Sequence, residues 1–337
     1  MLKRLLRPRR AEEPVVVKLR EGKLIVLSDL HLGLRTSRAR SNYEAAASLL
    51  RSLREDSDLK GLVLLGDIVE LWQSSAKDLL EAAYTFFREA LSLDVPLYYV
   101  TGNHDRIITH SPLELGRGKG RAVIVPDYLI VDAGDKACIL LHGHQLDRLF
   151  LATRGLWRLE SYVYTLSEAL ISLPGPSEWV IAVVSVASSA LVFTVSSTLP
   201  PHVKPIAYYG SVVLLLPLVL LVWRYVQSRA WYLFLAPLFY GLARSRMRYR
   251  KLRELELPLR EYLSEVPASE REKVRCAVLG HTHVPEMVEV GGLTLVNAGS
   301  WVSDSPQPNT FVELSRDKVR LLAWSGGEVK VLGERKW

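Results

Sequence analysis

"LYYVTGNHD", residues 97–105, joins an apolar run to a polar turn. The run at 97–100 predicts a short buried strand, because consecutive apolar residues before a glycine are typical of strands inside a sheet. The amide, imidazole and carboxylate that follow, Asn103, His104 and Asp105, have no place in a packed core. Ligands of open α/β sheets bind at the carboxyl ends of the strands. This turn is therefore a candidate site.

Other predicted strands end in the same way. The polar residues that follow them are Asp29 and His31, Asp67, His142 and His144, and His281 and His283. Six of the eight histidines of the chain lie in these five turns. One such turn alone is typical of a cap or of a hydrogen-bonded polar group. Five of them, each after a strand, indicate a shared site.

Apolar runs alternate with helical patterns on both sides of the middle of the chain. Helices are predicted at 41–55 and 74–93. Strands are predicted at 23–28, 61–65, 97–100, 122–125, 128–131, 136–141, 274–279, 287–290, 293–296, 311–314 and 318–323. The pattern predicts a layered α/β (α+β) domain. The two cysteines lie in strand-like runs and are expected to be buried free thiols.

Two long uncharged runs, 179–199 and 205–223, interrupt this domain. A helix needs about 20 apolar residues to span a bilayer, so the runs predict a hairpin of two membrane spans. A basic segment at 224–253 follows, which predicts that both ends face the cytoplasm. The expected localisation is the cell membrane, multi-pass, with a cytoplasmic catalytic domain. The alternative is a pair of core helices.

The charge pattern completes the expected domain organisation. The formal charge is +7, and thirteen basic residues without a single acid lie in 1–10 and 224–253. The predicted parts are a basic N-terminal arm at 1–22, a domain split into 23–145 and 271–337, and a helical insertion at 146–270 that contains the hairpin 179–223. An amphipathic helix is expected at 156–173. Residues 230–243 suit either a membrane interface or packing on the domain.

The residue types in the five turns indicate a particular metal chemistry. Carboxylates, imidazoles and one amide, without thiolates, suit manganese, iron or zinc in a catalytic rather than a structural site. Seven ligands are too many for one tetrahedral ion. Two ions need an anionic bridge, for which Asp67 is the best candidate. Such a pair of ions supports hydrolysis of a phosphoester or phosphoanhydride.

The order Asp-x-His, Gly-Asp, Gly-Asn-His-Asp, His-Gly-His and Gly-His-x-His resembles the calcineurin-type metallophosphoesterase superfamily. The resemblance implies two face-to-face β-sheets flanked by helices, and two divalent ions, with manganese foremost and iron or zinc as alternatives. It implies that His104 contacts the phosphate and protonates the leaving group while Asp105 orients it. It implies one metal held by Asp29, His31, Asp67 and His283, and a second held by Asp67, Asn103, His142 and His281.

Residues 66–72, "GDIVELW", and the insertion are similar to those of UDP-2,3-diacylglucosamine pyrophosphohydrolases, which cleave a nucleotide-lipid pyrophosphate. This similarity implies a lipid-linked or nucleotide-lipid substrate, with the lipid bilayer as a partner. Those enzymes carry arginine in place of His104 and aspartate in place of His144. Nucleic acid is not expected as a partner, because no stripe of basic and stacking residues is apparent outside the hairpin.

Two alternative functions stay open. One is a membrane-tethered nuclease or nucleotide phosphodiesterase of the same superfamily. The other is a non-catalytic scaffold on the same fold, although such scaffolds lose metal ligands and this chain keeps the full set.

Overall fold

The computed structural model describes residues 14–37, 39–70, 74–105, 108, 122–146, 176–219, 222 and 251–337. The chain divides into two compact units. The first comprises Met1–Trp157 and Arg250–Trp337, and the second comprises Arg158–Tyr249. The second unit lies within the insertion that the sequence predicts, and the two β-sheets belong to the first unit.

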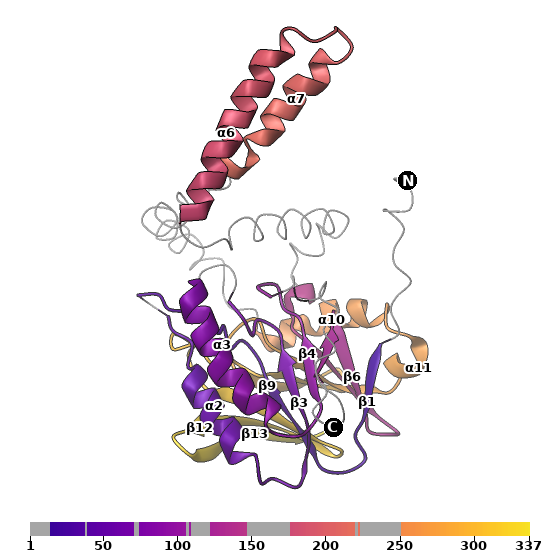
Figure 1. Cartoon of the computed structure of the whole chain (residues 1–337). Helices are drawn as coiled ribbons and strands as arrows, with labels where there is room; N and C mark the ends of the chain where they lie inside the picture. The colour runs from indigo at the N-terminus through magenta and orange to yellow at the C-terminus, as the bar shows by residue number, and fades with distance from the viewer. Residues whose placement is uncertain are drawn as a thin grey trace. The chain divides into compact units, whose positions relative to one another are not determined.

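The first unit contains two β-sheets (Figure 1). One has seven strands in the order β13-β12-β11-β2-β3-β4-β5, and the other has six in the order β1-β6-β7-β8-β10-β9. The strands of the first are β2 (Lys23–Leu27), β3 (Leu59–Leu65), β4 (Leu97–Val100), β5 (Ala122–Val125), β11 (Thr310–Ser315), β12 (Lys318–Ser325) and β13 (Glu328–Lys336). Those of the second are β1 (Val15–Lys18), β6 (Tyr128–Asp132), β7 (Ala137–Leu141), β8 (Val274–Leu279), β9 (Glu286–Val290) and β10 (Leu293–Asn297).

Parallel pairing places the functional turns at common edges. Strands β2, β3, β4 and β5 are parallel neighbours, and so are β7, β8 and β10. The carboxyl ends of β2, β3 and β4 therefore lie at one edge of the seven-stranded sheet. Those of β7 and β8 lie together at one edge of the other sheet. All five turns that the sequence singles out begin at these ends.

Alternating side chains build the layers, since successive residues of a strand point to opposite faces. On β2, Leu24 and Val26 pack between the two sheets, while Ile25 and Leu27 pack beneath α2 (Tyr43–Ser52) and α3 (Ala76–Leu91). The outer face of the six-stranded sheet packs on η4 (Leu252–Leu255) and α10 (Glu256–Leu263).

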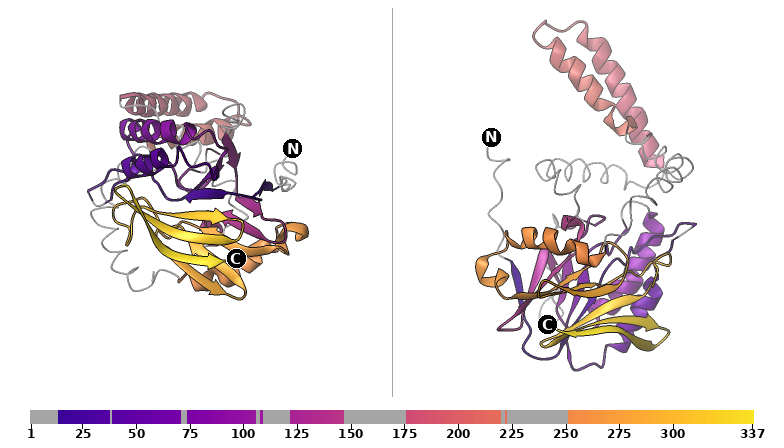
Figure 2. Two further views of the ribbon diagram at one scale, coloured as in Figure 1. Left: turned by 90° about the horizontal axis from the view of Figure 1, so that it is seen from below. Right: turned by 180° about the vertical axis from the view of Figure 1, so that it is seen from behind.

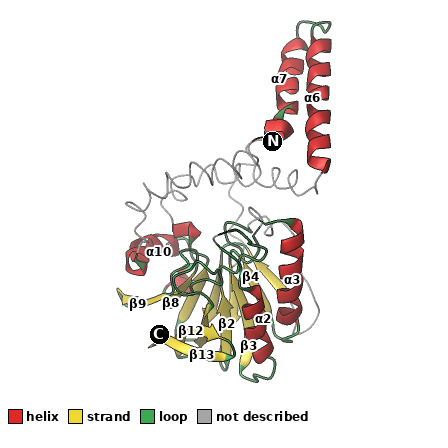
Figure 3. Ribbon diagram, turned by 90° about the vertical axis from the view of Figure 1, so that its left-hand side faces the viewer, coloured by secondary structure: helices red, strands yellow, loops and turns green. Residues whose placement is uncertain are grey.

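Figure 3 and the left view of Figure 2 show these layers, with α2 and α3 on one side of the sheets and α10 on the other. Two face-to-face sheets flanked by helices are thus confirmed. The two cysteines, Cys138 and Cys276, are free and buried on neighbouring strands, as expected.

The second unit contains α6 (Pro176–Ser196) and α7 (Lys204–Leu214), which pack against each other. Among the residues that the structure describes, no helix combines the length and the apolar character that crossing a bilayer requires. The predicted transmembrane hairpin and the multi-pass membrane localisation are therefore wrong. Helix α7 has 11 residues, so it is about 16 Å long, about half the thickness of a hydrocarbon core.

Two strands differ from the sequence-based expectation. Strand β1 lies inside the segment 1–22 that the sequence assigns to a basic N-terminal arm, and it pairs with β6 at the sheet edge. Strand β13 has no counterpart among the predicted strands, because its charged residues and Gly333 interrupt the apolar pattern. The predicted helix at 156–173, residues 230–243, and residues 1–13 of the arm lie outside the described residues.

Candidate metal centre

Five of the proposed ligands have a positive φ angle, a backbone conformation that residues other than glycine rarely adopt. The φ angles are 53° at Asp29, 44° at His31, 51° at Asp67, 71° at His281 and 57° at His283. Among the described residues other than glycine, two more have a positive φ. Such a conformation costs about 1–3 kcal/mol per residue, persists only where surrounding contacts impose it, and clusters at functional sites. The turns therefore carry strain where the ligands are.

Glycines before the ligands permit close approach of the turns. A Cβ atom on Gly102 would lie 2.2 Å from the Asp67 Oδ1 atom, and one on Gly66 would lie 2.4 Å from the Nδ1 atom of His142. A Cβ atom on Gly280 would also clash with the side chains behind it. Glycine is required at these positions because any side chain would displace a ligand.

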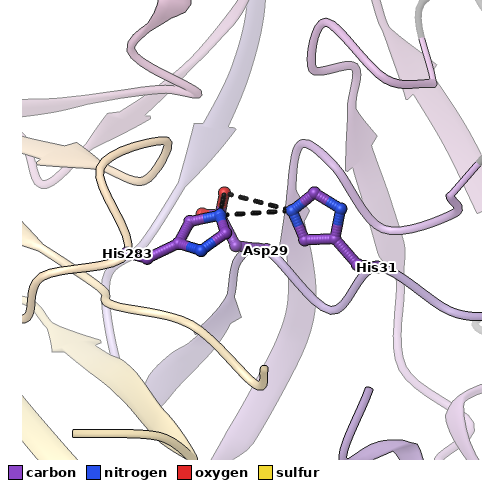
Figure 4. A group of neighbouring side chains, drawn as sticks. All are labelled: Asp29, His31 and His283. Atoms are coloured by element: carbon purple, nitrogen blue, oxygen red, sulfur yellow. Dashed lines mark hydrogen bonds and ion pairs between the residues drawn. The ribbon is translucent and has the colours of Figure 1, made fainter. Parts of the chain in front are cut away.

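The first ligand group comes from the turns after β2 and β8 (Figure 4). The Nε2 atom of His283 lies 3.2 Å from Oδ1 of Asp29 and 3.2 Å from Nε2 of His31. The His31 Nε2 atom lies 4.0 Å from the same oxygen of Asp29. Two imidazole nitrogens and one carboxylate oxygen thus converge on one point, which suits a divalent cation.

The second group consists of Asp67, His142 and His281, whose ligand atoms all lie within 4.8 Å of one another. The His142 Nε2 atom is 3.2 Å from Oδ2 of Asp67. The same Asp67 oxygen lies 3.9 Å from Nε2 of His31, a member of the first group. Asp67 therefore lies between the two groups, at the position that a bridging ligand needs.

Buried atoms without a hydrogen bond test whether cations fit here. In the described part of the chain, the buried side-chain atoms that accept or donate no hydrogen bond include Oδ1 of Asp29, Oδ1 of Asn103 and Nε2 of His142. Leaving a buried polar group unsatisfied costs about 1–3 kcal/mol, and more for a charged group. All three atoms belong to the proposed ligand set. Metal ions would satisfy them, so the residues present fit a dinuclear centre.

The charges of the site favour cations as well. Burial opposes ionisation of Asp67, but the imidazoles of His142 and His104 hold its pKa well below the usual range. Burial likewise lowers the pKa of His142, but the carboxylates of Asp67 and Asp29 outweigh this and raise the pKa to about 10. Without metal, a protonated imidazole therefore balances part of the negative charge of the ionised carboxylates. Metal ligands must be deprotonated, so metal binding displaces these protons.

Hydrogen bonds behind the ligands set their orientation. The Nδ1 atom of His142 lies 3.0 Å from the carbonyl oxygen of Leu65, which directs Nε2 toward Asp67. Oδ2 of Asp29 accepts hydrogen bonds from the Ser28 hydroxyl at 2.5 Å and from the His281 backbone N–H at 2.9 Å. These contacts orient the His142 ring and leave Oδ1 of Asp29 for a metal.

The turn after β4 wraps around the proposed bridging carboxylate. The backbone N–H of His104 donates to Oδ1 of Asp67 at 2.9 Å. In the sequence, Asn103 lies between Gly102 and His104. The rings of His104 and His31 meet edge to face, with centroids 4.9 Å apart. The His104 ring therefore lies beside the ligand groups.

Glu70 is a site residue that the sequence-based reasoning missed. Its Oε2 atom is 2.8 Å from Nδ1 of His31, and its Oε1 atom is 3.1 Å from Nδ1 of His104. Burial opposes its ionisation, but the hydrogen bonds to His104 and His31 lower its pKa to about 2. One carboxylate thus orients a metal ligand and the candidate acid. Its place in "GDIVE", three residues after Asp67, was the available signal.

The expectation that Asp105 orients His104 is not what the structure shows. Oδ2 of Asp105 accepts from the backbone N–H of Ile68 at 2.8 Å and from the hydroxyl of Tyr99 at 2.6 Å. Its Oδ1 atom accepts from the backbone N–H of Gly102 at 2.6 Å. Asp105 thus joins the turns that carry the ligands, and Glu70 takes the orienting role.

Replacement of Glu70 by glutamine should lower kcat by about 10- to 100-fold, the usual effect of losing a residue that orients metal ligands. Glutamine keeps the length of the side chain but cannot accept from both imidazoles through charged oxygens. Glu70→Asp keeps the negative charge but shortens the side chain. It should retain more activity than Glu70→Gln only if the charge of residue 70 matters more than the length of its side chain. Metal affinity, measured by calorimetry, should fall in Glu70→Gln because His31 loses its orientation. Unchanged affinity and kcat would disprove this role.

Comparison with known proteins identifies a family. Residues 22–212 match the family model of calcineurin-like phosphoesterases, which is more than half of the chain. A comparison with proteins of curated function finds no match.

Among solved structures, the chain is similar to a single mutant of Vps29 from Entamoeba histolytica. The identity is 13%, the TM-score is 0.38, and the match covers 94% of this chain and 99% of that one. YfcE, a phosphoesterase from E. coli, has 13% identity and a TM-score of 0.40, with coverage of 93% and 98%. GAP50 of Plasmodium has 12% identity and a TM-score of 0.40, with coverage of 94% and 88%. Likenesses at this level carry no argument about activity.

The family match spans the turns after β2, β3, β4 and β7, which supply Asp29, His31, Asp67, Asn103 and His142. The same side chains lie in the two ligand groups or in the turn around Asp67. The sequence match and the geometry agree: the chain belongs to the calcineurin-like phosphoesterase family.

Proposed function

We propose that this protein is a hydrolase that uses two divalent metal ions to cleave a phosphoester or pyrophosphate bond. The observation that carries the proposal is the pair of adjacent ligand groups, one of which contains Asp67, with buried ligand atoms that make no hydrogen bond. When bound, the ions would lower the pKa of a water molecule and neutralise the phosphoryl oxygens.

The chain's own residues supply the proton that the leaving group needs. The Nδ1 atom of His104 contacts Glu70, so Nε2 is the nitrogen that can protonate a leaving oxygen. Burial lowers the pKa of His104, but the carboxylates of Asp67 and Glu70 raise it overall. A general acid must hold a proton that it can donate to the leaving group, and the carboxylate of Glu70 beside Nδ1 favours the protonated ring.

A finer proposal concerns the substrate, which we infer to carry its phosphate on a lipid or a nucleotide-lipid. The similarity of "GDIVELW" to UDP-2,3-diacylglucosamine pyrophosphohydrolases supports this inference. The apolar residues that α6 and α7 expose, such as Val183, Leu191 and Ile206, support it as well. Water-exposed apolar surfaces of this kind usually mark binding sites.

Metal removal tests whether hydrolysis depends on divalent ions, and a substrate comparison tests whether the substrate is linked to a lipid. The full chain, stripped by chelation and then supplied with manganese, iron or zinc, should hydrolyse a small phosphodiester only with metal. The kcat/KM for a lipid-linked pyrophosphate should exceed that for the small phosphodiester by about tenfold or more, because contacts remote from phosphorus contribute binding energy.

Each alternative function predicts a different outcome. Activity that survives exhaustive chelation would disprove metal dependence. A preference for single-stranded DNA would favour the nuclease alternative. Failure to hydrolyse any of these substrates with both metals bound would favour a scaffold.

A further inference from the structure

Helix α3 carries a second apolar face, and its residues Leu80, Tyr84 and Leu91 are exposed among the residues that the structure describes. Leu80, Tyr84 and Leu91 are 70%, 68% and 47% exposed. Together with the partly buried Phe87 they repeat at intervals of four, three and four residues. With 3.6 residues per turn, this spacing aligns them in one stripe along the helix.

Among the described residues, Leu80, Tyr84 and Leu91 take no part in the core that α3 covers. The opposite face of α3 already supplies Ala82, Phe86 and Ala90 to the core beneath the seven-stranded sheet. Figure 3 shows α3 at the outside of the layers. A helix that is apolar on both faces usually has a partner on the outer one.

The spacing of the stripe fits a second copy of the same helix in antiparallel orientation. If Leu80 lies opposite Leu91 of the second copy, then Tyr84 lies opposite Phe87 of that copy, and the reverse pairs form by symmetry. Each large residue thus meets another, as at the a and d positions of an antiparallel coiled coil. A two-fold interface requires this kind of self-complementarity.

The charges beside the stripe are complementary in the same arrangement. Glu81 and Arg88 are exposed and lie on one flank of the stripe, seven residues apart. In the antiparallel pairing, Glu81 of one copy lies within two helix positions of Arg88 of the second copy. By symmetry, Arg88 of the first copy lies equally close to Glu81 of the second. Opposite charges at flanking positions favour a particular partner and orientation.

Arg88 has charge to spare for such a contact. It lies 3.0 Å from Glu89, but Arg51 and Arg54 also contact this buried carboxylate. Three guanidinium groups thus share one negative charge within the chain. A carboxylate from a second copy would balance part of the excess.

From this self-complementary stripe and flank, we propose that the outer face of α3 is a self-association surface on which a second copy of this chain docks its own α3 antiparallel. The proposal is independent of the catalytic activity, since it uses no residue of the metal centre.

Sedimentation velocity of the full chain should show a dimer in equilibrium with monomer at concentrations up to about 100 µM. Glu81→Arg alone or Arg88→Glu alone should raise the dimer Kd about tenfold or more, because each places like charges opposite each other. The double variant, Glu81→Arg with Arg88→Glu, should restore the Kd to within about threefold of wild type, since the pairs re-form with reversed polarity.

Tyr84→Glu should abolish the dimer, whereas Val329→Glu, at an exposed apolar position of β13, should leave it unchanged. Both positions are exposed in the monomer, so circular dichroism and hydrolysis of a small phosphodiester should stay normal. A monomeric wild type would overturn the proposal. A dimer that survives Tyr84→Glu, or a double variant that dissociates like the single ones, would also overturn it. If wild type is monomeric and Tyr84→Glu lowers Tm, another segment of the same chain covers the stripe.

Discussion

Asp67→Asn should lower kcat by about 1000-fold or more, the largest effect that we expect from a single substitution. Asp67 lies between the two ligand groups, with Oδ2 3.2 Å from His142 and 3.9 Å from His31. Loss of the carboxylate that would bridge two catalytic ions removes several kcal/mol of transition-state stabilisation. About 1.36 kcal/mol corresponds to a tenfold change in rate. Asparagine can still accept from the His104 backbone N–H.

Asp94→Asn is the matched control for this variant. Asp94 also has a positive φ, 49°, but it is exposed and follows α3. Its replacement should leave kcat and metal content unchanged. Metal content, measured by mass spectrometry, should fall in Asp67→Asn because the shared anion is lost. Retention of both metals with normal kcat would show that Asp67 is not the bridge.

His104→Ala should lower kcat by about 100-fold or more while metal content stays near wild type, the usual scale for losing a general acid. The ring of His104 contacts Glu70, but its backbone N–H, which alanine retains, is the group that reaches Asp67. The loss should be smaller for a nitrophenyl substrate, whose leaving group needs little protonation.

His202→Ala provides the control, since His202 is exposed in the turn between α6 and α7. This variant should behave as wild type with every substrate. If His104→Ala instead loses both metals, His104 is a ligand or a structural residue. Equal losses for good and poor leaving groups would contradict proton transfer to the leaving oxygen.

Strand positions and the five turns could be predicted from the sequence because both depend on residues that are close neighbours along the chain. A buried strand needs consecutive apolar residues, and β4, β5 and β8 match the predicted ranges. A parallel sheet then places the residues after neighbouring strands at one edge. Asp29, Asp67 and His281 could thus be named as candidates before any contact was known, although their left-handed backbone conformation could not.

The membrane prediction failed because an uncharged run is not the same as a helix of that length. Residues 205–223 lack charge throughout, yet α7 ends at Leu214, and a turn at Leu215 separates it from the helical residues 216–219. Composition measures the apolar character of a segment. It does not determine where the backbone stops being helical, which depends on capping and on packing against α6.

The sequence by itself determined the family, the layered α/β class and the ligand types, because short-range patterns specify strands, turns and the chemistry that follows them. Only the tertiary structure decided which carboxylate orients the candidate acid. Glu70 and Asp105 both lie in turns of the site, but Glu70 reaches the His104 ring while Asp105 binds Ile68 and Tyr99. The direction of the side chains and the spacing between strands decide which carboxylate contacts the His104 ring. Neither can be deduced from the residues that are neighbours along the chain.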